Sequence, residues 1–327
     1  MKVLRHISYR LLLALTLLSA TLTGMAQVDA QFTQYWAAPG YYNPAAIGRV
    51  DSIHITAGSR LQWVGIKHAP MTFLGMGDMP FKFLNKRWGT GVVIQQQSMG
   101  LYSSLNIGAQ IAYKHKIGKG TLTMGAQVGL IRESFKGDSI FIPEGDQAHT
   151  SADDAIPQST VTGNAMDLSA GVFYQHKWFW VGASVAHITE PSVTLKTEGD
   201  AEKLYEFQQG RIYYFMAGSN IPIKNTLFEI QPSIFAKTDA QFFQGEATVR
   251  VRYNKFLSGG VGYRYKDAVS LMIGAEFKNF FIGYSYDYST SAISKASSGS
   301  HEVFMNYNVK LNLGDKNKNK HKSIRLM

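Results

Sequence analysis

The chain repeats one short pattern between Gln31 and Asn312: about ten residues that alternate between apolar and polar side chains, followed by a turn. In the last repeat, Val303, Met305 and Tyr307 fall on one face, and only Phe304 breaks the alternation. Side chains of a strand point to opposite faces in turn, so each repeat makes a ribbon with one apolar side. Fourteen such ribbons predict an all-β fold, a 14-stranded antiparallel transmembrane β-barrel of the bacterial outer membrane.

An export signal precedes the repeats. Lys2, Arg5 and Arg10 come before an apolar run at 11–18, which is too short to cross a bilayer. Small residues at Gly24 and Ala26 are typical of signal-peptidase cleavage. We therefore predict a signal peptide over 1–26. The short apolar run argues against the alternative, an N-terminal membrane anchor.

The connections between the predicted strands alternate in length. The predicted strands are 51–62, 70–79, 89–98, 103–116, 120–134, 164–176, 178–188, 210–220, 227–237, 242–253, 258–265, 269–277, 279–288 and 301–313. The long connections, 135–163, 189–209 and 289–300, all follow odd-numbered strands. Bacterial barrels have short periplasmic turns and long outer loops, so the termini of the chain are predicted on the periplasmic side. The expected parts are a leader over 27–49, the barrel over 50–313 and a basic periplasmic tail over 314–327.

Charged side chains recur at positions that face the predicted lumen. Fourteen strands enclose more space than the wall side chains alone can fill. Either ion-paired networks hold the wall and inserted segments together, or the charges line a selective pore. The lumen charges are Arg60, Lys114, Asp167, Glu229, Glu246, Arg250, Arg252, Glu276, Asp287 and Glu302.

The leader is rich in aromatic and amide side chains although it precedes the first strand. Pro39, Gly40, Pro44 and Gly48 exclude a long helix or a central strand. These side chains suit a segment packed in or at the barrel mouth; the alternative is a partly ordered leader. The candidate plug or partner-binding residues are Gln31, Phe32, Gln34, Tyr35, Tyr42, Asn43 and Pro44.

No motif with the spacing of an enzyme active site is present, so we expect no catalytic, cofactor or metal site and no enzymatic activity. His149 with Asp153 and Asp154, or His187 with Glu190, could bind a metal, but solvated acidic loops explain them as well. The chain has no cysteine, which excludes disulfides and thiolate metal sites.

The positive charge is concentrated in the tail. Beyond residue 26 the net charge is +7, and residues 315–325 carry +4 of it. A nucleic-acid surface needs basic residues spread over a folded face, so we expect no nucleic-acid binding. The tail is too polar to bury a core, and it is either a solubilising segment or a tether to an acidic periplasmic partner.

Several short motifs resemble one known family. The segments 31–35 (QFTQY), 42–45 (YNPA), 60–65 (RLQWVG), 69–72 (APMT) and 299–303 (GSHEV) are similar to segments of the PorP/SprF family. The resemblance implies a non-enzymatic outer-membrane component of the Bacteroidota type IX protein secretion and gliding-motility machinery. It implies two kinds of partner, a secreted cargo or adhesin C-terminal domain and the periplasmic lipoproteins or ring subunits of the machine. The alternative function is a general porin or small-solute channel embedded in outer-membrane lipid.

Overall fold

The computed structural model describes residues 29–137, 157, 159–197 and 205–311; the predicted signal peptide and the tail lie outside them. The strands are β1 Ser52–Leu61, β2 Met71–Phe83, β3 Lys86–Met99, β4 Tyr102–Ile117, β5 Gly120–Lys136, β6 Thr160–Gln175, β7 Phe179–Ala186, β8 Ser192–Thr197, β9 Tyr205–Gln208, β10 Ile212–Ser219, β11 Ile221–Pro222, β12 Phe228–Thr238, β13 Phe243–Tyr253, β14 Leu257–Arg264, β15 Ala268–Phe277, β16 Phe280–Ser289 and β17 Ser300–Lys310.

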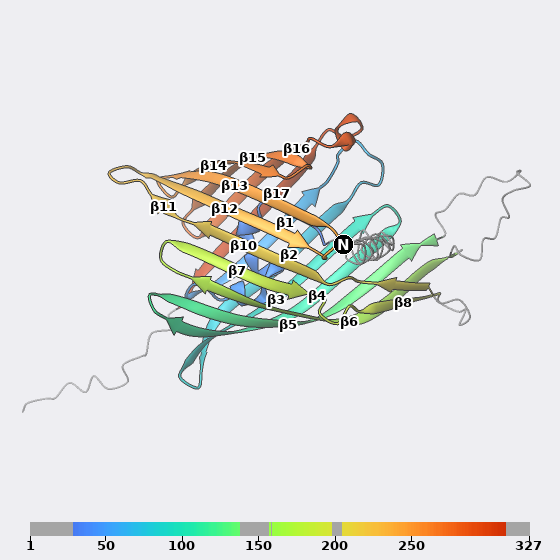
Figure 1. Cartoon of the computed structure of the whole chain (residues 1–327), viewed down its shortest axis with the longest axis horizontal. Helices are drawn as coiled ribbons and strands as arrows, with labels where there is room; N and C mark the ends of the chain where they lie inside the picture. The colour runs from blue at the N-terminus through green and yellow to red at the C-terminus, as the bar shows by residue number, and fades with distance from the viewer. Residues whose placement is uncertain (1–28, 138–156, 158, 198–204, 312–327) are drawn as a thin grey trace, which may run out of the picture.

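Fourteen of these strands form a closed antiparallel barrel, as the sequence predicts. The wall closes because β1 pairs with both β2 and β17, so that Ser52 lies opposite Lys310. Because the connections alternate in length, the barrel has one end with short turns and one with long loops. They are called here the short-turn end and the long-loop end (Figure 1). The wall begins and ends at the short-turn end. The rule for bacterial barrels predicts that this end faces the periplasm.

The structure differs from the predicted strands in two places. The predicted nine-residue connection from Pro80 to Trp88 is wrong: β2 and β3 extend until only Leu84 and Asn85 join them. Pro80 is tolerated because β1 pairs with β2 only as far as Asp78, so no neighbouring strand needs its missing N–H. The loop over 189–209 contains the hairpin β8–β9, which the sequence pattern did not predict. Its strand β8 continues the sheet by pairing with β6 (Figure 1).

The two faces of the wall carry different side chains. On β4, Ile107 and Ile111 are exposed toward the position of lipid, whereas Gln110 and Ala112 are buried inside the barrel. This alternation holds around the wall and gives a belt of exposed apolar and aromatic residues. Within the described residues, no helix has the length and apolar character needed to cross a membrane.

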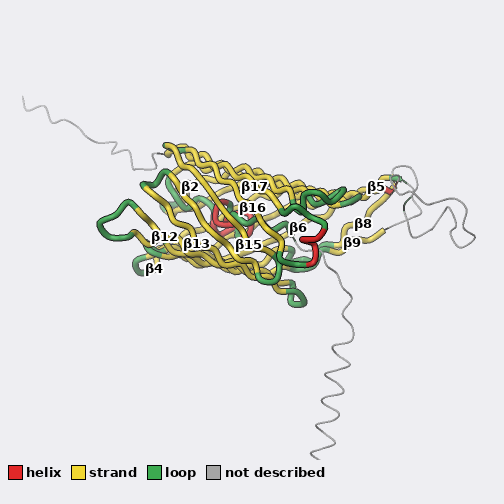
Figure 2. Tube along the Cα trace, turned by 90° about the horizontal axis from the view of Figure 1, so that it is seen from above, coloured by secondary structure: helices red, strands yellow, loops and turns green. Residues whose placement is uncertain are grey.

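The leader lies inside the lumen (Figure 2). It forms three short helices: η1 (Tyr35–Ala37), α2 (Pro39–Tyr42) and η2 (Pro44–Ala46). Proline begins both α2 and η2, and the Asn43 side chain accepts a hydrogen bond from the Ala45 N–H to start η2. The C-terminal part of the leader leads to the start of β1 at the short-turn end. Asp29, its first described residue, instead contacts wall residues near the long-loop end.

Candidate functional site

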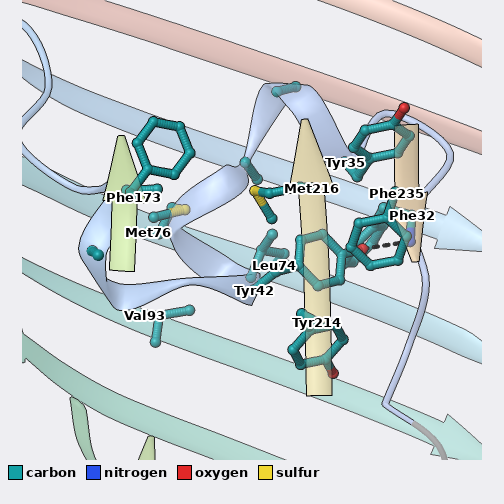
Figure 3. Close-up of a cluster of buried hydrophobic side chains, with 14 of the residues drawn as sticks. Phe32, Tyr35, Tyr42, Leu74, Met76, Val93, Phe173, Tyr214, Met216 and Phe235 are labelled. Atoms are coloured by element: carbon teal, nitrogen blue, oxygen red, sulfur yellow. Dashed lines mark hydrogen bonds between the residues drawn. The ribbon is translucent and has the colours of Figure 1, made fainter. Parts of the chain in front are cut away.

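A cluster of buried apolar side chains joins the leader to the wall (Figure 3). The Tyr35 ring stacks on Phe235 with centroids 5.1 Å apart, and the Tyr42 ring lies 4.6 Å from the same ring. The Phe32 N–H donates to the Tyr42 hydroxyl, which fixes the fold of the leader on itself. The wall side of this cluster includes Leu74, Met76, Val93, Phe173, Tyr214, Met216, Phe235 and Phe304.

Phe304 breaks the strand alternation because it belongs to this cluster. It points into the lumen, is fully buried and packs edge-to-face on Phe32 at 5.2 Å. A polar residue at this position would face the leader without an apolar contact. An apolar residue at a lumen-facing position, such as Phe304, is therefore the sequence signal for an internal plug.

Glycines in the wall make room for the leader backbone. A Cβ atom at Gly125 would overlap Pro44 and Ala45, and one at Gly171 would overlap the Asn43 side chain. Because these positions have no side chain, the Asn43 amide reaches the wall and donates to the carbonyls of Val172 and Ala183 at 3.0 and 3.2 Å. The inner surface of the wall is thus complementary in shape to this segment.

A second contact zone is charged and centres on Thr33. The Thr33 hydroxyl donates to Asp287 at 2.7 Å and accepts from Arg60 at 3.1 Å and Arg264 at 2.9 Å. Arg60 also pairs with Asp287 at 2.7 Å and with Glu302 at 3.1 Å. All five side chains are buried. The hydroxyl of a leader residue therefore completes an ion-paired network built from side chains of four wall strands, β1, β14, β16 and β17.

The leader also satisfies a surplus of wall carboxylates in this network. Arg264 pairs with Glu246 at 2.8 Å and with Asp287 at 3.3 Å, so two guanidinium groups face three buried carboxylates. The backbone N–H groups of Thr33 and Gln34 each donate to Glu302 at 2.8 Å, and the Gln31 amide donates to Glu246 at 2.8 Å. Buried charge is tolerated only when it is paired and hydrogen-bonded, so this part of the wall requires the leader.

Asp29 forms a third contact at the long-loop end. It accepts hydrogen bonds from Tyr214 at 2.6 Å and from His187 at 3.2 Å, and Asp167 faces the other ring nitrogen of His187 at 3.1 Å. Burial alone would lower the pKa of His187, but the two carboxylates raise this pKa to about 10. His187 is therefore a cation that lies between two carboxylates, and its Nε2 atom ties the leader to the wall. Glu190 does not join it and pairs with Arg211 at 3.6 Å.

The leader forms the floor of a cavity of about 230 Å³ at the long-loop end. The floor is Asp29, Ala30 and Gln31, and amides, hydroxyls and paired charges form the walls. Trp63, Tyr102 and Phe207 add aromatic surface, and Phe207 comes from the hairpin β8–β9. Concave sites with aromatic side chains and a few polar groups are where proteins bind ligands.

The remaining predicted lumen charges lie nearer the short-turn end. Arg252 pairs with Glu229 at 2.6 Å and with Glu276 at 3.2 Å, and these side chains are partly exposed. The Arg250 guanidinium lies 3.2 Å from the centre of the Trp36 ring of the leader. Lys114 is half-buried next to Arg87 in the register of β3 and β4. His149, Asp153 and Asp154 lie outside the described residues, and no cluster that could hold a metal occurs within them.

Comparison with known proteins identifies the family. A family model described as the type IX secretion system membrane protein PorP/SprF matches residues 24–307. No match was found among curated proteins. Among solved structures, the CymD monoaromatic hydrocarbon channel is 12% identical over 89% of this chain and 97% of its own, with a TM-score of 0.48. A Pseudomonas aeruginosa FadL homologue is 10% identical over 84% and 94%, with a TM-score of 0.46. The chain belongs to the PorP/SprF family of type IX secretion system membrane proteins and is an outer-membrane β-barrel.

Proposed function

We propose that this protein is a plugged, non-enzymatic component of type IX secretion. Its long-loop end would hold a secreted cargo or adhesin C-terminal domain, and its short-turn end would contact periplasmic lipoproteins or ring subunits of the machine. The observation that carries this proposal is the leader, which fills the lumen and is fixed there by apolar, charged and backbone contacts. A filled lumen favours a binding role over solute passage.

The cavity above the leader supports the long-loop end as the cargo-binding face. Its lining combines fixed charges with amides and aromatic rings, and the hairpin β8–β9 extends the surface beyond the wall. The hairpin packs on the wall through a small core of Val193 and Leu195 with Ile131 of β5 and Val161 of β6. A supported hairpin can present a partner with a defined surface.

Site-specific photo-crosslinking in secreting cells tests this proposal. A photoreactive residue at Gln97, which lines the cavity, should crosslink to a cargo C-terminal domain. The same residue at Val128, which is exposed on the lipid side of β5, is the matched control and should not.

Planar-bilayer conductance distinguishes the alternative, a general porin. The intact protein should conduct little, whereas deletion of residues 31–48 should open the lumen. Steady currents through the intact protein, together with no cargo crosslink at Gln97, would support the porin function instead.

A further inference from the structure

Every one of the six turns at the short-turn end has a lysine within it or at its edge. The turns join β2 to β3, β4 to β5, β6 to β7, β10 to β12, β13 to β14 and β15 to β16. The lysines are Lys86, Lys119, Lys177, Lys224, Lys255 and Lys278. No aspartate or glutamate occurs within these turns, and all six lysines are exposed. Within the described residues, none of them forms a salt bridge.

Each lysine lies within two residues of a large apolar side chain that faces outward. The apolar partners are Leu84, Ile117, Trp178, Ile223, Phe256 and Phe277, all of which are exposed. The Lys177 ammonium lies 5.0 Å from the centre of the Trp178 ring, and the Lys278 ammonium lies 5.2 Å from that of Phe277. An apolar group beside a cation matches the boundary of a bilayer, where the first enters the acyl region and the second reaches the phosphates.

Two of these lysines have a backbone conformation that limits which residues can replace them. Lys255 and Lys278 both have a φ of 54°, in the left-handed region that favours glycine or asparagine.

The long-loop end lacks this pattern. Its connections carry both signs, including Glu190, Asp239 and Asp267, and the turn between β3 and β4 has no charge. The lysines of the short-turn end instead continue around the whole barrel circumference. A sheet of negative charge that surrounds the barrel fits this arrangement better than a compact partner that contacts one sector.

We propose that these six turns form a lysine collar that binds the phosphate headgroups of anionic phospholipids in the leaflet nearest the short-turn end. The collar would fix the depth of the barrel and gather anionic lipid around it. Phosphates attract basic side chains near a membrane surface, and the attraction weakens with salt. This inference does not depend on cargo binding.

Native mass spectrometry of the full folded protein tests the collar. The protein is equilibrated with equal amounts of phosphatidylglycerol and phosphatidylcholine, and the retained lipids are counted. A triple variant, Lys177→Gln with Lys255→Asn and Lys278→Asn, should lose at least fivefold of its preference for phosphatidylglycerol, since one lysine contributes about fivefold. Asparagine is chosen because it tolerates the left-handed backbone.

The matched control changes three exposed lysines at the other end: Lys67→Gln, Lys266→Asn and Lys295→Gln. Lys266 has a φ of 57° and lies 5.1 Å from the Tyr265 ring, which reproduces the geometry of Lys278. The control should keep the wild-type preference. Equal losses in both variants, or no preference in the wild type, would overturn the proposal. So would a triple variant that binds lipid normally but loses an acidic periplasmic protein.

Discussion

The two halves of the leader are held in different ways. In the first half, residues 31–34, all but Phe32 contact a buried network of arginines and carboxylates. In the second half, residues 35–47, the contacts are with aromatic rings and wall glycines, and Phe32 shares this apolar cluster. Apolar burial is not directional, so the second half contributes affinity for the lumen. The charged half has fixed partners and fixed geometry, so it selects one position of the leader along the barrel. The first half thus sets the position of the leader along the barrel, and the second half sets the strength of its binding to the lumen.

Removal of Arg60 should have the largest effect. The Arg60→Ala substitution leaves Asp287 and Glu302 short of a buried partner, and breaking such a pair destabilises by about 3–5 kcal/mol. Urea unfolding of the barrel in micelles measures the loss. Because the chain has no cysteine, an added Ala38→Cys substitution reports release of the leader through maleimide labelling.

Arg252→Ala is the control for this experiment. Arg252 also pairs with two carboxylates, but these groups are partly exposed near the short-turn end. Its loss should change stability by less than about 1 kcal/mol. Equal losses for the two variants would remove the distinction between the charged network and an ordinary ion pair.

A side chain at Gly125 should test the second half of the leader. Gly125→Val forces a branched side chain against Pro44 and Ala45, and overpacking of this kind typically destabilises by about 1–3 kcal/mol. The Ala38→Cys reporter should show faster labelling. Gly75→Val is the matched control, because a Cβ at Gly75 meets nothing within 4 Å. If both variants label equally slowly, the glycine seat does not hold the leader.

The third anchor of the leader, the Asp29 contact, is tested by its pH dependence. His187 has a pKa of about 10 in the folded protein against 6.5 in an unfolded chain, so its contribution is complete below pH 6.5 and is lost as the pH rises toward 10. The urea midpoint should therefore fall between pH 6 and pH 9. His187→Gln should reduce this fall, and His115→Gln, on the exposed face of β4, should not. An unchanged slope in His187→Gln would contradict this assignment.

The sequence predicted the wall much better than the site. Strand alternation is local, and it placed all fourteen wall strands, because each strand must present one face to lipid. The contact of Thr33 with Asp287 and Arg264 joins residues more than two hundred positions apart, and no local pattern contains it. Phe304 and Gly125 did carry information about the site. An apolar side chain, or a glycine, at a lumen-facing position indicates that another segment packs against the wall there. This information becomes usable only when the lumen-facing side of each strand is known.

The pairing of the first and last strands, which closes the barrel, lies at the charged network that binds the leader. Arg60 on the first strand lies opposite Glu302 on the last strand, and both contact Thr33. The last strand to leave the ribosome therefore supplies both the closing hydrogen bonds of the wall and a partner of the leader. Closing the wall and fixing the leader in the lumen then become one cooperative event. A barrel that lacks its last strand also lacks Glu302, which binds the leader. Such coupling makes a closed lumen a mark of completed assembly.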